Sequence, residues 1–112
     1  MSDKERCRKA IKKGAEMRER EIEKYLVKRV KELGGKAFKF VSPGNDGVPD
    51  RLVCLPGGRV LFVELKSPGK KPTPLQQMQM EFIRSLGFDV DWASSKADVD
   101  VLLRRYDEMK LR

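Results

Sequence analysis

The chain contains no histidine and only two cysteines. Without histidine, a histidine general base, a Ser-His or Cys-His nucleophilic pair and a His-bound zinc site are all excluded. Cys7 and Cys54 are too few for a disulfide framework, and Cys54 lies in an apolar run typical of a buried strand, so we expect a reducing compartment. Any catalysis by this chain must therefore rely on carboxylates and lysines.

Long apolar runs are missing as well. No segment approaches the roughly 18 apolar residues of a membrane span, and the N-terminus, MSDKERCRKA, has no apolar stretch like that of a secretion signal. We therefore expect an intracellular, cytoplasmic protein without a membrane partner. A length of 112 residues predicts a single domain over residues 1–112.

Positive charge is in excess and unevenly distributed. The formal net charge is +8, and residues 1–36 hold 13 basic and 7 acidic side chains whereas residues 37–112 hold 12 and 10. We interpret residues 1–15 as a basic helical arm, helical throughout or partly frayed without a partner. This distribution predicts an anionic partner, with nucleic acid favoured over a membrane surface.

Turn signals divide the chain into seven elements of an α/β domain. Gly34-Gly35 ends the first helix, Pro56-Gly57-Gly58 separates two apolar runs as in a hairpin, and Thr73-Pro74-Leu75-Gln76 has the pattern of a capping box that opens a helix. The predicted order is a helix over 2–33, strands at 36–41, 51–55 and 59–65, a helix from 73, a strand at 88–93 and a last helix from 95. This order predicts a hairpin at the centre of the sheet and a crossover helix before the last strand.

Apolar spacing predicts which side of each helix packs. The first helix carries a stripe at Ile22, Tyr25, Leu26, Arg29, Val30 and Leu33; the second carries Leu75, Met78, Phe82 and Leu86; the third turns Val99, Leu102, Leu103 and Tyr106 inward. We assign Trp92, Met78 and Met80 to core or interface packing.

The predicted hairpin brings two carboxylates together. If the loop is Pro56-Gly57-Gly58, counting outward from the turn places Asp50 opposite Glu64. Like charges at such positions destabilise a sheet unless a cation lies between them. A loop of two or four residues would shift the register and separate the pair.

The second hairpin strand carries further polar groups on the same face. Val60, Phe62, Glu64 and Lys66 project to one side, so an apolar row ends in a carboxylate and an ammonium. Because burying unpaired charges is costly, we interpret this end as a site. Asp50, Glu64 and the carbonyl of Leu65 would form a partial shell for a hard cation such as Mg²⁺, and Lys66 could orient or deprotonate a bound water.

A third carboxylate comes from the first helix. At about 100° per residue, Glu19 falls within the apolar stripe, Glu21 points away and Glu23 lies near the edge. Glu19 is our first choice and Glu23 the alternative, and a solvated helix face is a serious rival for Glu19.

These residues together resemble a known family. Gly47-Val48-Pro49-Asp50, thirteen intervening residues and Glu64-Leu65-Lys66 resemble the PD-(D/E)XK nuclease signature. A glutamate on a preceding helix, Gly34-Gly35, Thr-Pro-x-Gln and the later Leu86-Gly87 narrow the resemblance to a stand-alone VRR-NUC (virus-type replication-repair nuclease) domain over residues 16–103.

The resemblance implies a restriction-endonuclease-like core with a mixed central sheet flanked by helices. It also implies phosphodiester hydrolysis that depends on Mg²⁺ or Mn²⁺, and a homodimer that cuts branched double-stranded DNA such as four-way (Holliday) junctions, without a small-molecule cofactor. Carried over by position, Asp50 and Glu64 would bind metal, Lys66 would be the catalytic lysine, Glu19 the helical acid and Gln76 a glutamine near the active site. Gln76 could cap its helix, serve the site or do both.

Several further residues are candidates for contacting nucleic acid. They lie in the loops beside the predicted site and in the basic arm: Ser42, Asn45, Lys70, Lys71, Arg6, Arg8, Lys9, Lys12 and Lys13. The arm is the more persuasive group, because phosphate contacts add up. Three alternatives stay open: a non-catalytic module that binds branched DNA, a nuclease with flap, nicking or exonuclease specificity, and a nuclease that acts on RNA.

Overall fold

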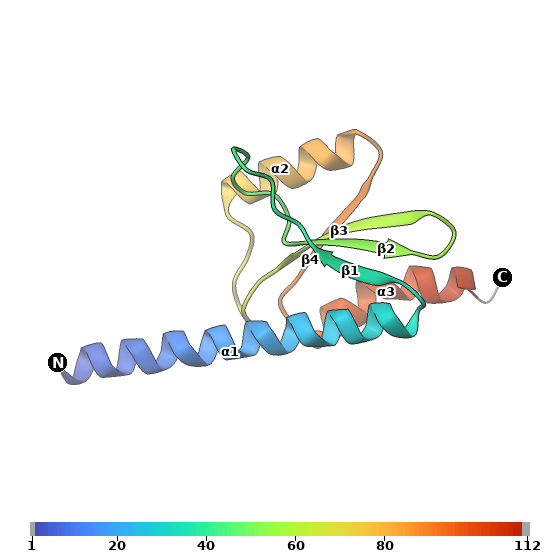
Figure 1. Cartoon of the computed structure of the whole chain (residues 1–112). Helices are drawn as coiled ribbons and strands as arrows, with labels where there is room; N and C mark the ends of the chain where they lie inside the picture. Colours follow the sequence, from blue (N-terminus) through green and yellow to red (C-terminus); the bar gives the residue numbers. More distant parts are fainter. Residues whose placement is uncertain (1, 111–112) are drawn as a thin grey trace.

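A computed structural model describes residues 2–110, with side chains described for Ser2 and residues 18–107. It has the predicted α/β order of elements (Figure 1). The elements are α1 (Asp3–Glu32), β1 (Lys36–Lys39), β2 (Arg51–Leu55), β3 (Arg59–Leu65), α2 (Pro74–Ser85), β4 (Asp89–Ala93) and α3 (Lys96–Lys110). The strands form one mixed sheet in the order β1-β2-β3-β4, antiparallel except for the parallel pair β3 and β4.

The central hairpin has the register that the sequence predicted. Leu55 pairs with Arg59 across the turn, and the ladder continues to Arg51 opposite Val63. Gly57 and Gly58 have φ values of 84° and 75°, a region that L side chains rarely adopt, so these glycines close the turn without strain. The hairpin therefore fixes which residues of β2 and β3 share a face.

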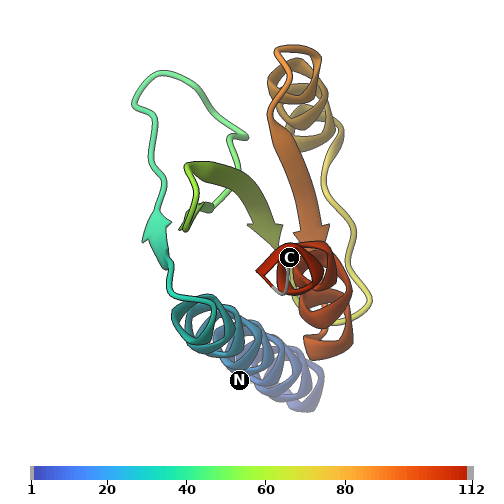
Figure 2. The same ribbon diagram turned by 90° about the vertical axis from the view of Figure 1, so that its right-hand side faces the viewer.

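Helices α1 and α3 cover one face of the sheet, where the core lies (Figures 1 and 2). The stripe of α1 is confirmed, because Ile22, Leu26, Val30 and Leu33 are buried and Tyr25 packs against them. The strands contribute their odd-numbered residues to this core, and α3 contributes its predicted inward residues: Val53, Leu55, Leu61, Val63, Leu65, Val99, Leu102, Leu103 and Tyr106. One face of β3 is consequently part of this core, and the other face is not.

Helix α2 lies on the opposite face and packs against β4. Met80 is its buried residue, at 4% exposure. The apolar stripe of α2 does not face the core, since Leu75, Met78, Phe82 and Leu86 are 44%, 62%, 62% and 61% exposed. Of the two methionines assigned to packing, Met80 is in the core and Met78 is on the surface.

The first strand is shorter than predicted. Strand β1 ends at Lys39 and not at Val41. The Phe40 amide still donates a hydrogen bond to the Asp50 carbonyl at 2.8 Å, but the chain then leaves the sheet and Val41 is 78% exposed. Across residues 2–110, none of the helices combines the length and the apolar character needed to cross a membrane.

Candidate active site

Asp50 and Glu64 meet at the open end of the β2–β3 hairpin. Asp50 immediately precedes β2, and the ladder extended by one residue beyond Arg51 and Val63 places it opposite Glu64. The Leu65 amide donates a hydrogen bond to Asp50 Oδ2 at 3.1 Å, which fixes that carboxylate against β3. The two carboxylates are therefore held together by the backbone.

Glu64 is a buried acid with an incomplete set of partners. The residue is 2% exposed, and its Oε2 atom is buried without a hydrogen-bond partner in the described structure. Its Oε1 atom lies 3.9 Å from Lys66 Nζ. Burial, and next the negative charge of Asp50, raise the pKa of Glu64 to about 8. A buried oxygen without a partner beside a second carboxylate is an arrangement that a cation would stabilise.

Gln76 connects α2 to this acid. Its backbone amide donates to Thr73 Oγ1 at 3.2 Å and its Oε1 accepts from the Thr73 amide at 2.9 Å, so the predicted capping box is present. Its Nε2 donates to Glu64 Oε1 at 3.2 Å. Gln76 thus both caps its helix and contacts the candidate site, because the capping box fixes its side chain above β3.

The two candidate glutamates of α1 have different surroundings. Arg51 forms an ion pair with Glu23 and donates to the Ala37 carbonyl at 3.1 Å, so Glu23 is held by the sheet. Burial raises the pKa of Glu19, as do the charges of Asp50 and Glu23, while Lys66 and Lys70 oppose them. Of the two glutamates, Glu19 is therefore the one whose carboxylate interacts with the charges of Asp50 and Lys66.

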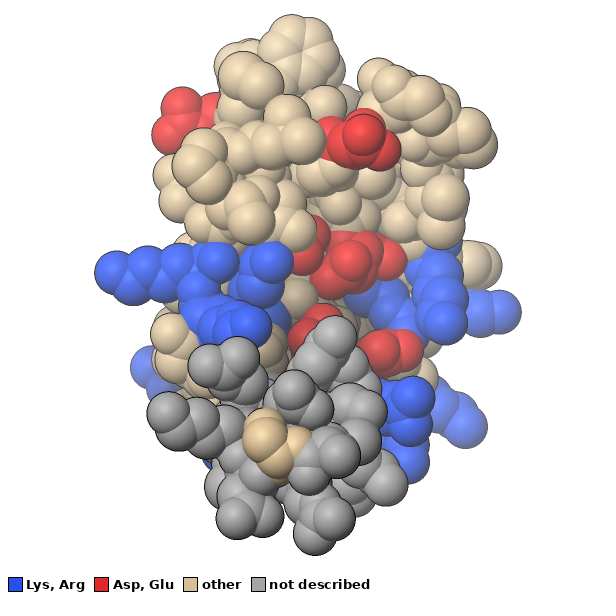
Figure 3. Space-filling model, turned by 90° about the vertical axis from the view of Figure 1, so that its left-hand side faces the viewer, with Lys and Arg blue, Asp and Glu red and all other residues tan. Residues whose placement is uncertain are grey.

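A cavity of about 240 Å³ lies between α1, β1 and the open end of the hairpin. Glu19 and Glu23 line it from α1, Asp50 and Leu65 line it from the hairpin, and Lys39 lines it from β1. Figure 3 shows acidic side chains at the middle of this face with Lys and Arg side chains on both sides. Sequence reasoning missed Lys39 and Arg51; their positions at the end of β1 and next to Asp50 are the signals that could have identified them.

The donor set fits a hard cation only in part. Asp50 and the free Glu64 Oε2 supply oxygen atoms of the kind that Mg²⁺ and Mn²⁺ prefer. Among the described residues, no group of three Asp, Glu, Cys or His side chains is close enough to form a ready cation cage. Glu19 lines the cavity without completing such a group, so its role as a metal ligand, like that of the Leu65 carbonyl, stays a prediction.

The predicted nucleic-acid contacts are in several places. Asn45 Nδ2 donates to Ser42 Oγ at 2.9 Å within the exposed loop before Asp50. Lys70 is near enough to affect Glu19, but Lys71 lines a separate cavity of about 160 Å³ with Trp92. The backbone of the arm is helical from Asp3 onward, whereas the side chains of Arg6, Arg8, Lys9, Lys12 and Lys13 lie outside the described part of the structure.

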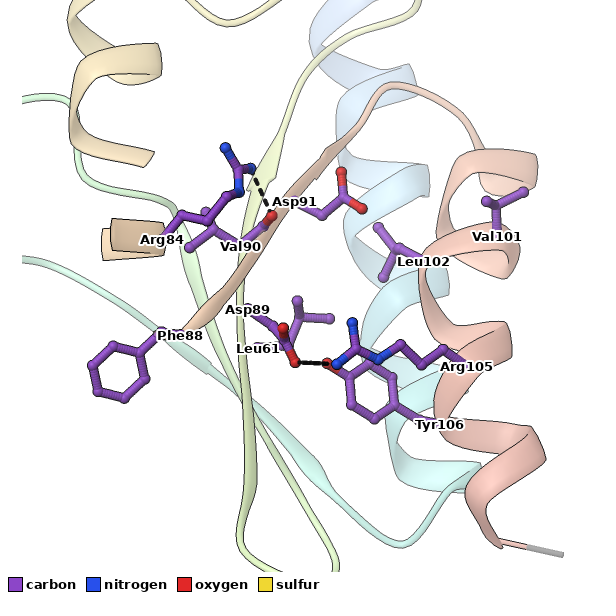
Figure 4. A pocket seen from close by; sticks show the side chains of 10 residues that line it. All are labelled: Leu61, Arg84, Phe88, Asp89, Val90, Asp91, Val101, Leu102, Arg105 and Tyr106. Atoms are coloured by element: carbon purple, nitrogen blue, oxygen red, sulfur yellow. Dashed lines mark hydrogen bonds and ion pairs between the residues drawn. The ribbon is translucent and has the colours of Figure 1, made fainter. Parts of the chain in front are cut away.

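A larger cavity, of about 400 Å³, lies between β4 and α3 (Figure 4). Its charged groups already have partners. Asp89 Oδ2 accepts from Arg105 at 3.0 Å and from Tyr106 at 2.9 Å, and Arg84 donates to the Val90 carbonyl at 2.9 Å. These contacts join β4 to α3 and to α2, so we interpret this cavity as structural.

Comparison with known proteins gives consistent results. No protein-family model matches the chain. The chain is 55% identical over 74 residues to "Putative nuclease p44" of Acyrthosiphon pisum secondary endosymbiont phage 1, a match that spans 66% of this chain and 80% of that protein. A solved structure described as "VRR_NUC domain" has 38% identity and a TM-score of 0.74, covering 80% of this chain and 97% of the other.

A second solved structure, described as "VRR_NUC domain protein", has 21% identity and a TM-score of 0.60 over 80% of this chain and 88% of the other, which supports the fold alone. The 38% identical structure is covered almost completely, at 97% of its length. The chain therefore belongs to the VRR-NUC family.

Proposed function

We propose that this chain is a divalent-metal-dependent endonuclease that hydrolyses phosphodiester bonds in branched DNA. The observation that carries the proposal is the buried Glu64 carboxylate, whose Oε2 has no hydrogen-bond partner among the described residues although Asp50 faces it and Lys66 lies beside it. A purely structural acid in this position would have its hydrogen bonds satisfied.

Each residue of the site has a proposed task. Asp50 and Glu64, with Glu19 across the cavity, would hold Mg²⁺ or Mn²⁺, which would lower the pKa of a water and neutralise charge on the scissile phosphate. Lys66 would orient the attacking water and stabilise the negative charge that develops on the phosphate oxygens. Gln76 would hold the Glu64 carboxylate in place through its Nε2 donor.

The charge distribution supports a nucleic-acid substrate. Lys and Arg side chains lie on both sides of the acidic side chains in Figure 3, and Lys39 lines the cavity that Glu19 and Asp50 also line. Such an arrangement attracts phosphates while the acidic centre is reserved for a cation. The similarity to the phage protein named "Putative nuclease p44" agrees with this function, and for a viral protein it would be carried out in the cytoplasm of the host cell.

A homodimer would suit a branched substrate. Each copy offers one Asp50–Glu64 pair, and a symmetric four-way junction needs two cuts. A two-fold dimer solves this requirement because its axis can coincide with that of the substrate.

The test is cleavage of labelled substrates with Mg²⁺ or Mn²⁺. Four-way junction, flap, linear duplex, single strand and RNA are compared, with Asp50→Ala and Lys66→Ala as controls. We expect cleavage of the junction by the unaltered chain and a loss of about 10²-fold or more in both variants. Cleavage of RNA or flaps in place of the junction would show that the enzyme is specific for those substrates and not for the junction. Junction binding without cleavage, or cleavage that both variants retain, would contradict the proposal that this chain is an enzyme with this active site.

A further inference from the structure

Trp92, the single tryptophan of the chain, lies beside the candidate active site and outside the buried core. The register of the parallel strands places Trp92 on β4 opposite Glu64 on β3. Adjacent strands lie about 4.8 Å apart, and paired residues project to the same face of a sheet. The Trp92 side chain is only partly buried, so part of its surface is accessible. A large aromatic ring is therefore next to the acid that would hold the metal.

Trp92 lines the cavity of about 160 Å³ that Lys71 also lines. Lys71 and Pro72 come from the segment between β3 and α2, which runs beside β4 in Figure 2. Helix α2 supplies the remaining lining residues, which are Gln77, Met80, Glu81 and Arg84. Pro72 and Met80 are buried, whereas the charged residues are exposed. The cavity consequently combines apolar walls with a charged rim.

Two hydrogen bonds to backbone carbonyls hold the walls of this cavity in place. Gln77 Nε2 donates to the Pro72 carbonyl at 2.9 Å, which fixes the loop to α2. Arg84 donates to the Val90 carbonyl at 2.9 Å, which fixes α2 to β4. A site whose walls are already ordered loses less entropy when a ligand binds. The cavity is thus shaped before any ligand enters it.

The chemistry of the lining indicates a nucleobase. The volume is well below the roughly 300 Å³ at which pockets for larger organic ligands begin, so one small ring system is the occupant that fits. An exposed aromatic ring stacks on a base of any sequence, and Lys71 and Arg84 supply positive charge for the adjoining phosphates. Glu81 adds an acceptor for the amino group of a base.

We propose that this cavity is a subsite for one unpaired base of the DNA strand that is cut, stacked on Trp92 with a neighbouring phosphate on Lys71. The inference rests on the proposed function and adds a source of its preference for branched DNA. Phosphates repeat about every 3.4 Å along a strand, so the separation of Glu64 and Trp92 corresponds to one or two nucleotides. Moving a base out of the stack costs least where it is already unpaired, as it is at a branch point.

The test uses tryptophan fluorescence, because any signal from this chain comes from Trp92. The full chain is titrated in a chelator, which prevents metal-dependent cleavage, with three probes: oligothymidylate, an abasic strand of equal length and free thymidine monophosphate. The anisotropy of the labelled strands measures binding in parallel. We expect oligothymidylate to quench the emission and the abasic strand to bind without quenching. This titration needs no variant, so it decides the proposal whether or not a substitution at Trp92 folds.

Substitutions then separate stacking from charge. Trp92→Leu should weaken the binding of oligothymidylate about tenfold, whereas Trp92→Phe, which keeps a ring, should stay within about threefold of the unaltered chain. Lys71→Ala should weaken both strands equally and lower the salt dependence of binding. Lys28→Ala, at an exposed lysine of α1 away from the cavity, is the matched control for charge. Far-UV circular dichroism checks that each variant is folded.

The outcomes distinguish this subsite from the nuclease itself. Equal quenching by the abasic strand, or binding of oligothymidylate that Trp92→Leu leaves unchanged, would overturn the subsite and leave the nuclease standing. Quenching by the free nucleotide alone would also overturn it, since no strand would then reach Trp92. Quenching by oligothymidylate without cleavage of any substrate in Mg²⁺ or Mn²⁺ would keep the base-binding cavity and contradict the enzyme.

Discussion

Gln76 Nε2 donates a hydrogen bond to Glu64 Oε1 at 3.2 Å, while the Oε1 atom of the same amide accepts from the Thr73 backbone. The beginning of α2 and the buried acid of β3 are therefore held by one side chain. Substitutions at Thr73 and at Gln76 can separate the structural role of Gln76 from its role at the site.

We expect Thr73→Ala to cost about 1 kcal/mol of stability, because the first-turn amide of Gln76 loses its acceptor. The bond from Gln76 to Glu64 should survive, so cleavage should stay near normal. Gln76→Ala should cost a similar free energy and in addition lower the turnover number several-fold. Thermal melts and single-turnover cleavage of the two variants check this. Equal losses of activity in both would reduce Gln76 to a helix cap.

The two glutamates of α1 should separate in function. Glu23 is paired with Arg51, whereas Glu19 lines the cavity with Asp50 and is influenced by the charges of Asp50 and Lys66. If Glu19 helps to hold the proposed metal, Glu19→Gln should reduce cleavage at least about tenfold with little change in melting temperature. Glu23→Gln should lower the free energy of unfolding by about 1 kcal/mol and leave cleavage largely intact. The opposite pattern would make Glu23 the helical acid of the site.

The stability of the metal-free protein should depend on pH through Glu64. Its pKa is about 8 in the folded chain against an ordinary value of 4.5, so the folded state binds this proton more tightly. The resulting stabilisation is complete below pH 4.5 and is lost as the pH rises through 8. Glu64→Gln cannot ionise, so it should be the more stable protein above pH 8, by on the order of 2 kcal/mol. Urea titrations of both proteins in a chelator test this, and parallel pH profiles would contradict it.

Divalent cations should stabilise the chain through the same acid. With Mn²⁺ in large excess over its dissociation constant, linkage predicts about 2 to 3 kcal/mol of added stability. We expect the melting temperature to rise with Mn²⁺ at pH 7 and to return to its starting value when a chelator removes the metal. Asp50→Asn and Glu64→Gln should abolish the rise, and Ca²⁺-free buffer with monovalent salt alone is the control. A rise that both variants keep would place the cation elsewhere.

Much of the site could be predicted because it depends on counting along a hairpin. Once Pro56-Gly57-Gly58 is recognised as the loop, the pairing of Leu55 with Arg59 fixes the position of Asp50 opposite Glu64. The stripe of α1 was equally readable, since Leu26 and Val30 recur at helical spacing and both are fully buried.

The other features of the site depend on how the helices and strands pack against one another. The periodicity of apolar residues within one element does not show this packing. The spacing of Leu75, Met78 and Phe82 predicts an apolar side of α2 but not that Met80, on the other side, is the buried residue of this helix. The different surroundings of Glu19 and Glu23 likewise depend on Arg51, a residue 28 positions from Glu23 in sequence. Long-range partners of this kind have no local signal.

Because the side chains of β3 alternate between the two faces of the sheet, neighbouring positions of this strand should tolerate mutation differently. Leu61, Val63 and Leu65 are in the core on one side of the strand, and Glu64 and Lys66 are on the other. In a saturation mutagenesis library scored separately for protein abundance and for cleavage, neighbouring codons of this strand would then fall into different classes. Substitutions at the odd positions would deplete the protein itself, and those at Glu64 or Lys66 would leave an abundant but inactive one.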